Sequence, residues 1–221
     1  MAEPRAEANR MLRVSDGLAF ANMVDDMRNF HVREPNRKKK LICYSLVLFE
    51  VLMWETFIED IVDEGQEFML AHITDPKEFG FDVLLPVSSG LSERKDKRAI
   101  WDIAGNSWKT AVRTHRQELI SGFHTPRPEN VDALVAQTIG LKNLSDSWSW
   151  KNASNAKVKK RANDLITMRG AIAHSMLGVP TVHFQTFITR LQFTRRACEI
   201  SSNRIRKYIH SIVGIYPWDE L

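Results

Sequence analysis

Apolar residues recur at helical spacing along almost the whole chain, and this pattern limits the possible folds more than any other feature. They follow one another at intervals of three and four residues, whereas strict alternation of apolar and polar residues is rare. The first period places apolar side chains on one face of a helix, and the second would place them on one face of a strand. We therefore predict an all-α fold, a single helical bundle of six to seven helices over residues 1–221.

Glycine- and proline-containing segments separate the predicted helices. We expect helices at residues 5–30, 36–72, 92–121, 128–139, 154–174 and 181–213. Residues 73–91 contain two prolines and two glycines and are predicted to form a loop. The polar segment 141–154 is predicted to be an irregular connection. Pro128 and Gly140 are the residue types favoured in the first turn of a helix and just after its end.

The longest apolar segment, LICYSLVLFEVLMW, is interrupted by Glu50 and followed by Glu55. We expect a buried helix and no membrane association, because a span needs about 20 consecutive apolar residues. The N-terminal sequence is charged and has no apolar block behind it, so we predict a cytoplasmic protein without a secretory signal. Cys43 and Cys198 lie in apolar helical patterns and are predicted to be reduced core residues.

The basic residues are concentrated in the last third of the chain. Residues 151–221 contain 12 Lys and Arg against 4 Asp and Glu, whereas residues 1–150 contain 19 against 23. A basic segment indicates an anionic partner, of which nucleic acid is the commonest. A solvated basic surface without a function explains the charge alone equally well.

The fifth predicted helix carries the residues from which a chemical function can be argued. Leu165, Met168 and Ile172 repeat at helical spacing and form its predicted core stripe. At about 100° per residue, Arg169 and His174 lie about 140° apart around the helix. The arc between them contains mainly polar and small residues: Lys159, Asn163, Ile166, Gly170 and Ala173.

These residue types are sufficient for cleaving RNA without a metal ion. Arginine can hold a phosphate through two parallel hydrogen bonds, and histidine can transfer a proton near neutral pH. The sequence has no Cys/His cluster with the spacing of a metal site. The spacing itself is a weak indicator, because Arg204 and His210 form a second pair, in which a structural role is the better interpretation of His210. A histidine that ends a helix is also favoured there by the helix dipole.

The string LITMRGAIAHSM resembles the motif of the HEPN superfamily, helical bundles that carry Arg-x4–6-His and include many metal-independent endoribonucleases. The stretch TPRPENVDALVAQTIGLKNLSDSW, the basic helix after it and the segment WETFIEDIVDE look like the RiboL-PSP-HEPN family. This resemblance covers roughly residues 40–214 and implies that Arg169 and His174 are the catalytic pair. The family usually has Asn, Asp or His directly after the arginine, where this chain has Gly170.

We therefore predict an endoribonuclease without a cofactor, in which the 2′-hydroxyl of the RNA attacks the neighbouring phosphodiester. Arg169 would stabilise the charge of the transition state, and His174 would transfer a proton. Lys159 and Asn163 are predicted to bind RNA. Glu55 matches an acidic position in the resembling segment and is a candidate to orient Arg169, with a solvated helix flank as the alternative. The resemblance also implies a homodimer, a role as a toxin or anti-phage effector, and a regulatory partner protein: an antitoxin, a nucleotidyltransferase or an ATPase.

Other interpretations stay open. A non-catalytic HEPN-type module that binds RNA or a partner protein would also tolerate Gly170. A DNA-binding regulator fits the basic last third, although the sequence has no helix-turn-helix signature. Trp148 and Trp150 either stack on bases or cap the core. The sequence has no phosphate-binding loop, no dinucleotide fingerprint and no GxSxG motif.

Overall fold

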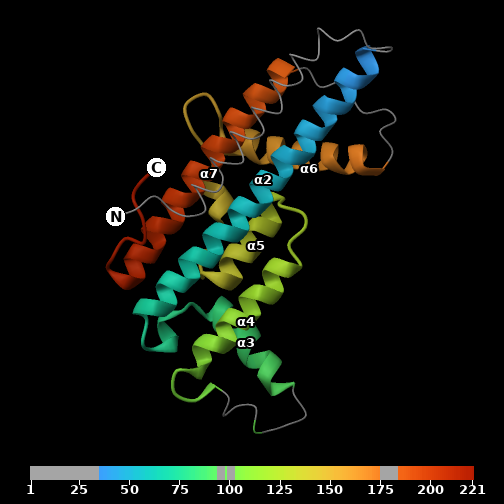
Figure 1. Ribbon diagram of the computed structural model, residues 1–221. Coiled ribbons are helices and arrows are strands. Elements are labelled where there is room, and N and C mark those ends of the chain that lie inside the picture. Colours follow the sequence, from blue (N-terminus) through green and yellow to red (C-terminus); the bar gives the residue numbers. More distant parts are fainter. Residues whose placement is uncertain (1–34, 94–97, 99–102, 175–183) are drawn as a thin grey trace.

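A computed structural model describes residues 35–93, 98, 103–174 and 184–221, and its regular structure is helical (Figure 1). The α-helices are α2 (Pro35–His72), α3 (Phe81–Ser92), α4 (Ser107–Ser121), α5 (Pro128–Thr138), α6 (Asn155–His174) and α7 (Phe184–Val213). Two short 3-10 helices, η2 (Pro76–Glu78) and η4 (Leu144–Ser147), lie in the connections. Within the described ranges the chain has no strand, so the predicted all-α class is confirmed.

Some predicted elements fall outside the described residues. These are the helix at 5–30, residues 94–97 and 99–102 of the helix at 92–121, and the start of the last helix at 181–183. The helices predicted at 36–72, 128–139 and 154–174 agree with α2, α5 and α6 to within one residue at each end.

The long helices α2 and α7 run parallel and side by side along most of their length (Figure 1). Glu50 accepts a hydrogen bond from Thr194 toward one end of the pair, and Gly65 lies against Ile209 toward the other. A Cβ atom at Gly65 would lie 3.0 Å from Ile209 Cδ1, a tight contact that would require the Ile209 side chain to shift by a few tenths of an ångström. Glycine at this position therefore allows the two helices to pack closely.

The helix α5 packs parallel to α2. The Trp54 indole donates to the carbonyl of Pro126 at 3.0 Å, and the Gln66 amide donates to the carbonyl of Thr138 at 2.5 Å. These bonds satisfy backbone carbonyls at the two ends of α5 with side chains from α2. They fix α5, and the loop before it, against the middle of the molecule.

All six α-helices contribute to one main apolar core. Trp148, in the connection between α5 and α6, is fully buried in it and donates a hydrogen bond to Ser201 Oγ at 2.9 Å. Trp150 packs on Phe193 with ring centroids 5.1 Å apart. Of the two interpretations of these tryptophans, packing on the core agrees with the structure. Cys43 and Cys198 are both buried, as predicted.

The prediction of a loop over residues 73–91 is wrong, because this segment contains η2 and α3. Asp75 and Glu78 form a reciprocal capping box that starts η2. In α3, Val83 is fully buried and anchors the helix, while Pro86 is only half-buried. A proline interrupts a helix by removing one backbone hydrogen bond, and near the surface water can satisfy the carbonyl that loses it.

Residues Lys40–His72 of α2 are long and apolar enough to cross a membrane, with a mean hydropathy of 1.8 over the most apolar window. Of that window, 56% is buried inside the protein. Core helices and signal sequences meet the same criterion of length and composition, so the criterion assigns no membrane role here.

Candidate functional site

Arg169 emerges from the packed face of α6. It is half-buried, and its neighbours at i−4, i−3 and i+3 are the buried residues Leu165, Ile166 and Ile172, which pack against α2. The predicted core stripe is therefore correct for Leu165 and Ile172. Ile166 is also buried, although the sequence pattern places it in the arc between Arg169 and His174. Met168, the third residue of the predicted stripe, is only partly buried. The packed face of α6 is thus wider than the sequence pattern suggested.

Glu55 of α2 lies within electrostatic range of Arg169 and of His124, in the loop between α4 and α5. Burial raises the pKa of the Glu55 carboxyl above its usual value, and the positive charges of Arg169 and His124 act in the opposite direction. No hydrogen bond or ion pair joins Glu55 to Arg169 among the described residues. The structure thus gathers an acid, a guanidinium and an imidazole from three separate segments.

His174 is the last residue of α6 and is exposed. Five residues of helix place His174 about 7.5 Å along the helix axis from Arg169 and about 140° around it. The two side chains therefore leave α6 in different directions. Gly170 lies between them, and a Cβ atom there would meet no described residue within 4 Å. Among the described residues, none therefore covers the α6 backbone at Gly170.

The two predicted RNA-binding residues already have partners. Asn163 Oδ1 accepts a hydrogen bond from Arg127 at 3.2 Å, and Arg127 also donates to Thr167 Oγ1 at 3.4 Å. Lys159 forms an ion pair of 2.5 Å with Asp146. Arg127 thus orients the Asn163 amide, and Asp146 neutralises part of the charge of Lys159.

Sequence reasoning missed His124 and Arg127. Both lie in the string GFHTPRP, which was interpreted only as a break between helices. The signal was present, because the prolines restrict this loop and hold its polar residues in few conformations. Only the fold shows that the loop reaches both α2 and α6.

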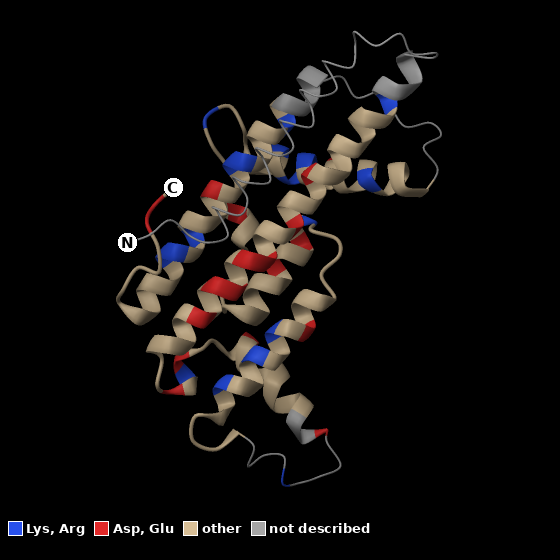
Figure 2. Ribbon diagram, viewed as in Figure 1, with Lys and Arg blue, Asp and Glu red and all other residues tan. Residues whose placement is uncertain are grey.

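Lys and Arg gather on α6 and α7, while Asp and Glu concentrate along the middle of α2 (Figure 2). Part of this basic surface is neutralised locally. Lys160 pairs with Asp164 at 2.7 Å, and Arg195 and Arg196 both pair with Glu199. The charge asymmetry of the sequence therefore produces a weaker surface field than the residue counts suggest.

The second Arg/His pair differs from the first. His210 stacks on Tyr216 with ring centroids 3.8 Å apart, which supports a structural role, and Arg204 is exposed on α7. His, Cys, Asp and Glu side chains form no group that could hold a metal ion in the described part of the chain.

Comparison with protein-family models, with curated proteins and with solved structures gave no match. The resemblance to HEPN proteins therefore stays a prediction from the motif strings. Any functional assignment depends on the geometry of these residues.

Proposed function

We propose that this protein is a metal-independent endoribonuclease whose site is built on Arg169 and His174. The observation that carries this proposal is the environment of Arg169. Arg169 is half-buried and adjoins the packed apolar face of α6, yet its guanidinium has no hydrogen bond or ion pair among the described residues. Leaving a partly buried charge unpaired costs free energy, and a bound phosphate would offset that cost.

In this proposal the 2′ oxygen of the RNA attacks the adjacent phosphorus, and the bond to the 5′ oxygen breaks. The products are a 2′,3′-cyclic phosphate and a 5′-hydroxyl. Arg169 stabilises the extra negative charge on the phosphoryl oxygens, and His174 takes up or supplies a proton. One proton leaves the 2′-hydroxyl and another reaches the leaving oxygen, so a second proton-transfer group is of use.

A second copy of the chain is our proposed source of that group. Leu41, Leu48 and Leu52 are exposed on α2 and share one stripe, which continues at helical spacing to Glu55. An apolar stripe beside the candidate site is well suited to a two-fold interface. Such an interface would bring the Arg169 and His174 of both copies to one cleft.

Mixing two inactive variants tests the shared site. Arg169→Ala and His174→Ala proteins, each inactive alone, are expected to regain cleavage together when dimers are confirmed by light scattering. His124 is the competing source within one copy. If His124→Ala abolishes cleavage and mixing restores nothing, the second imidazole belongs to the same copy and the shared site is wrong.

The reaction itself is tested with end-labelled tRNA and mRNA. We expect cleavage that persists in EDTA and leaves cyclic phosphate and 5′-hydroxyl ends. Fragments with 5′-phosphate ends that form only with magnesium would contradict the mechanism. RNA binding without cleavage would identify the non-catalytic module, and preference for duplex DNA would identify the DNA-binding regulator.

The same proposal includes a role as a toxin or anti-phage effector held in check by a partner protein. An unrestrained ribonuclease would damage its own cell, so we expect expression of the chain to arrest growth. Arg169→Ala should remove this toxicity, and co-expression of an adjacent gene product should suppress it. Growth arrest that persists in Arg169→Ala would separate toxicity from cleavage.

A further inference from the structure

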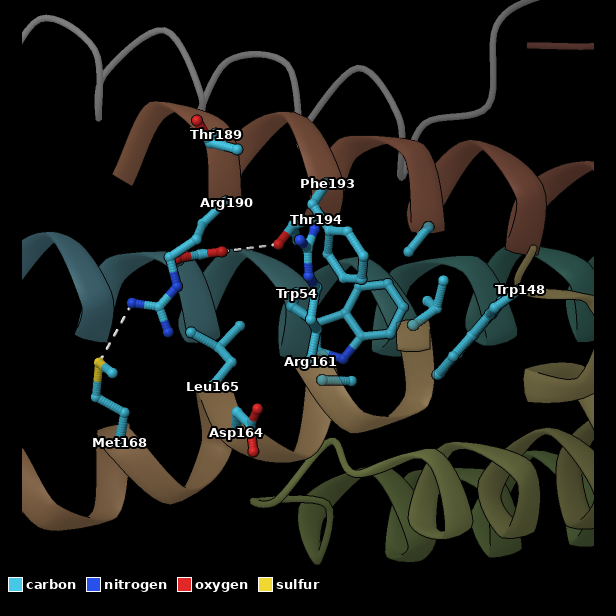
Figure 3. A pocket seen from close by; sticks show the side chains of 14 residues that line it. Trp54, Trp148, Arg161, Asp164, Leu165, Met168, Thr189, Arg190, Phe193 and Thr194 are labelled. Atoms are coloured by element: carbon cyan, nitrogen blue, oxygen red, sulfur yellow. Dashed lines mark hydrogen bonds between the residues drawn. The ribbon is translucent and has the colours of Figure 1, made fainter. Parts of the chain in front are cut away.

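A cavity of about 450 Å³ lies between α2, α6 and α7 (Figure 3). Its walls are largely apolar: Trp54, Trp148, Val158, Leu165, Met168 and Phe193. The indole nitrogens of Trp54 and Trp148 are already bonded to Pro126 and Ser201. Neither Arg169 nor His174 lines this cavity, so it is separate from the candidate cleavage site. Its volume and lining are typical of sites for small molecules.

Glu50 is the acid of this cavity, and its side chain is almost completely buried, at 1% exposure. One carboxylate oxygen, Oε1, accepts a hydrogen bond from Thr194 Oγ1 at 2.9 Å. The other, Oε2, has no hydrogen-bond partner among the residues that the structure describes. Burial raises the pKa of Glu50 to about 7. An unpaired polar atom at such a depth is costly, and a ligand that donates a hydrogen bond would remove the cost.

Arg190 is the base of the same cavity. Its guanidinium donates to Met168 Sδ at 3.2 Å, which is a weak acceptor for a charged donor. The positive charge of Arg190 acts on Glu50, yet no ion pair joins these two described side chains. Two further charged residues line the cavity: Asp164, which pairs with Lys160, and Arg161, whose guanidinium lies over the Phe193 ring. Glu50 and Arg190 therefore supply the acceptor and the cationic donor that no ion pair joins to each other.

We propose that this cavity binds a free α-amino acid with an apolar side chain. The α-ammonium group donates to Glu50 Oε2, the α-carboxylate accepts from Arg190, and the side chain lies among the aromatic residues. A zwitterion meets both charges, since its two charged groups are attached to one carbon. A simple amine would leave Arg190 beside another cation, and a simple acid would place its carboxylate near Glu50.

Calorimetric titration of the purified full-length chain with L-phenylalanine tests this proposal. We expect one site, and at least about tenfold weaker binding for phenethylamine, which lacks the carboxylate, and for 3-phenylpropionate, which lacks the ammonium group. L-serine tests the need for an apolar side chain and should bind more weakly still. The same series with L-leucine shows whether the pocket requires an aromatic ring.

Two variants assign the contacts. Glu50→Gln should weaken phenylalanine binding at least about tenfold and leave 3-phenylpropionate binding unchanged or tighter. Arg190→Gln should weaken phenylalanine binding and leave phenethylamine unchanged. Arg195→Gln, on the same helix but outside the cavity, is the matched control and should change nothing. Circular dichroism and thermal melts verify that each variant is folded.

Several outcomes would overturn the proposal. Phenylalanine that does not bind at millimolar concentration would show that the cavity is not a site for this class of ligand. Phenethylamine or 3-phenylpropionate binding as tightly as phenylalanine would show that the ligand is a simple amine or acid. Full affinity in folded Glu50→Gln would show that the buried carboxyl makes no contact with the ligand.

Discussion

The carboxylates in the two halves of α2 differ in whether arginine side chains form ion pairs with them. Near the C-terminal end of α2, Asp63 and Glu67 face α4, and the buried guanidinium of Arg116 bonds both, at 2.9 and 2.7 Å. Arg113 adds a two-point bond to Glu67, and these hydrogen bonds lower the pKa of that carboxyl. We refer to these four residues as the closed network. Its charges are matched, so it holds α2 against α4.

Toward the other end of the helix, Glu50 and Glu55 lack such partners. Burial raises the pKa of both carboxyls, and the nearby Arg190 and Arg169 act on them only through space. In this half of the molecule, the two carboxyls and the two guanidinium groups therefore form no ion pairs with one another within the described chain. The difference teaches that function should be sought where charged groups gather without satisfying one another, and stability where they do.

The largest expected effect comes from breaking the closed network. Arg116→Ala leaves Asp63 and Glu67 without their buried partner, and we expect the free energy of unfolding to fall by about 3 kcal/mol. Arg113→Ala is the matched control. Its side chain is 41% exposed, so its loss should cost less than about 1 kcal/mol. Urea denaturation measures both, and equal losses would show that the burial of Arg116 does not matter.

Removal of the Arg169 or the His174 side chain should reduce activity strongly and change stability little. Each alanine variant is expected to lose cleavage by about a hundredfold or more, because a transition-state partner is removed. The free energy of unfolding should change by less than about 1 kcal/mol, since neither side chain is hydrogen-bonded in the described structure. Initial rates on labelled RNA and thermal melts check this pair of results. Arg204→Ala is the control, and a greater loss of activity there would identify the wrong motif.

The buried Glu50 should make stability depend on pH. Its pKa is about 7 in the folded protein against 4.5 as the ordinary value, so the unfolded chain releases the proton first as pH rises. Stability should therefore fall between pH 4.5 and 7 and level off above that range. Glu50→Gln removes this cost and should be up to about 3 kcal/mol more stable than wild type at pH 8 and equal near pH 4. Equal stabilities at both pH values in urea would contradict the buried, unpaired carboxyl.

The smallest expected effect concerns Lys159. Its ion pair with Asp146 must open before it can meet a phosphate. Lys159→Ala should weaken RNA binding only a few fold. The slope of log Kd against log salt concentration should decrease by about one or less. Fluorescence anisotropy over a range of salt concentrations measures this. The exposed Lys157→Ala serves for comparison, and a loss as great as that of Arg169→Ala would place Lys159 within the site itself.

The sequence predicts those helices whose signals are local. Pro128 occupies the first turn of α5, and Gly140, with φ +91°, follows the C-cap residue Ile139, so both ends of α5 could be located. The loop prediction for residues 73–91 is wrong because glycine and proline are typical of loops, whereas here the capping box at Asp75 and the burial of Val83 stabilise helical turns. Burial depends on the rest of the fold, and no local pattern reports it.

The candidate site follows the same rule. Arg169 and His174 were found from a motif within one helix, but their unequal burial arises from the packing of α6 on α2. The contact from Arg127 to Asn163 joins residues 36 positions apart. The cavity at Glu50 combines three helices, and the sequence showed only an acidic residue within an apolar run.

The parallel pairing of α2 and α7 also sets the order in which the molecule can be completed. Glu50 and Thr194 are separated by 144 residues, whereas Gln66 and Thr138, which join α2 to α5, are separated by 72. Closing a longer loop costs more chain entropy, so α2, α4 and α5 can assemble before α7 docks. During synthesis on the ribosome, the side of α2 that α7 covers stays without its partner until the last part of the chain emerges. A truncated chain would therefore expose this apolar side, and binding to chaperones or aggregation is the expected fate of such a fragment.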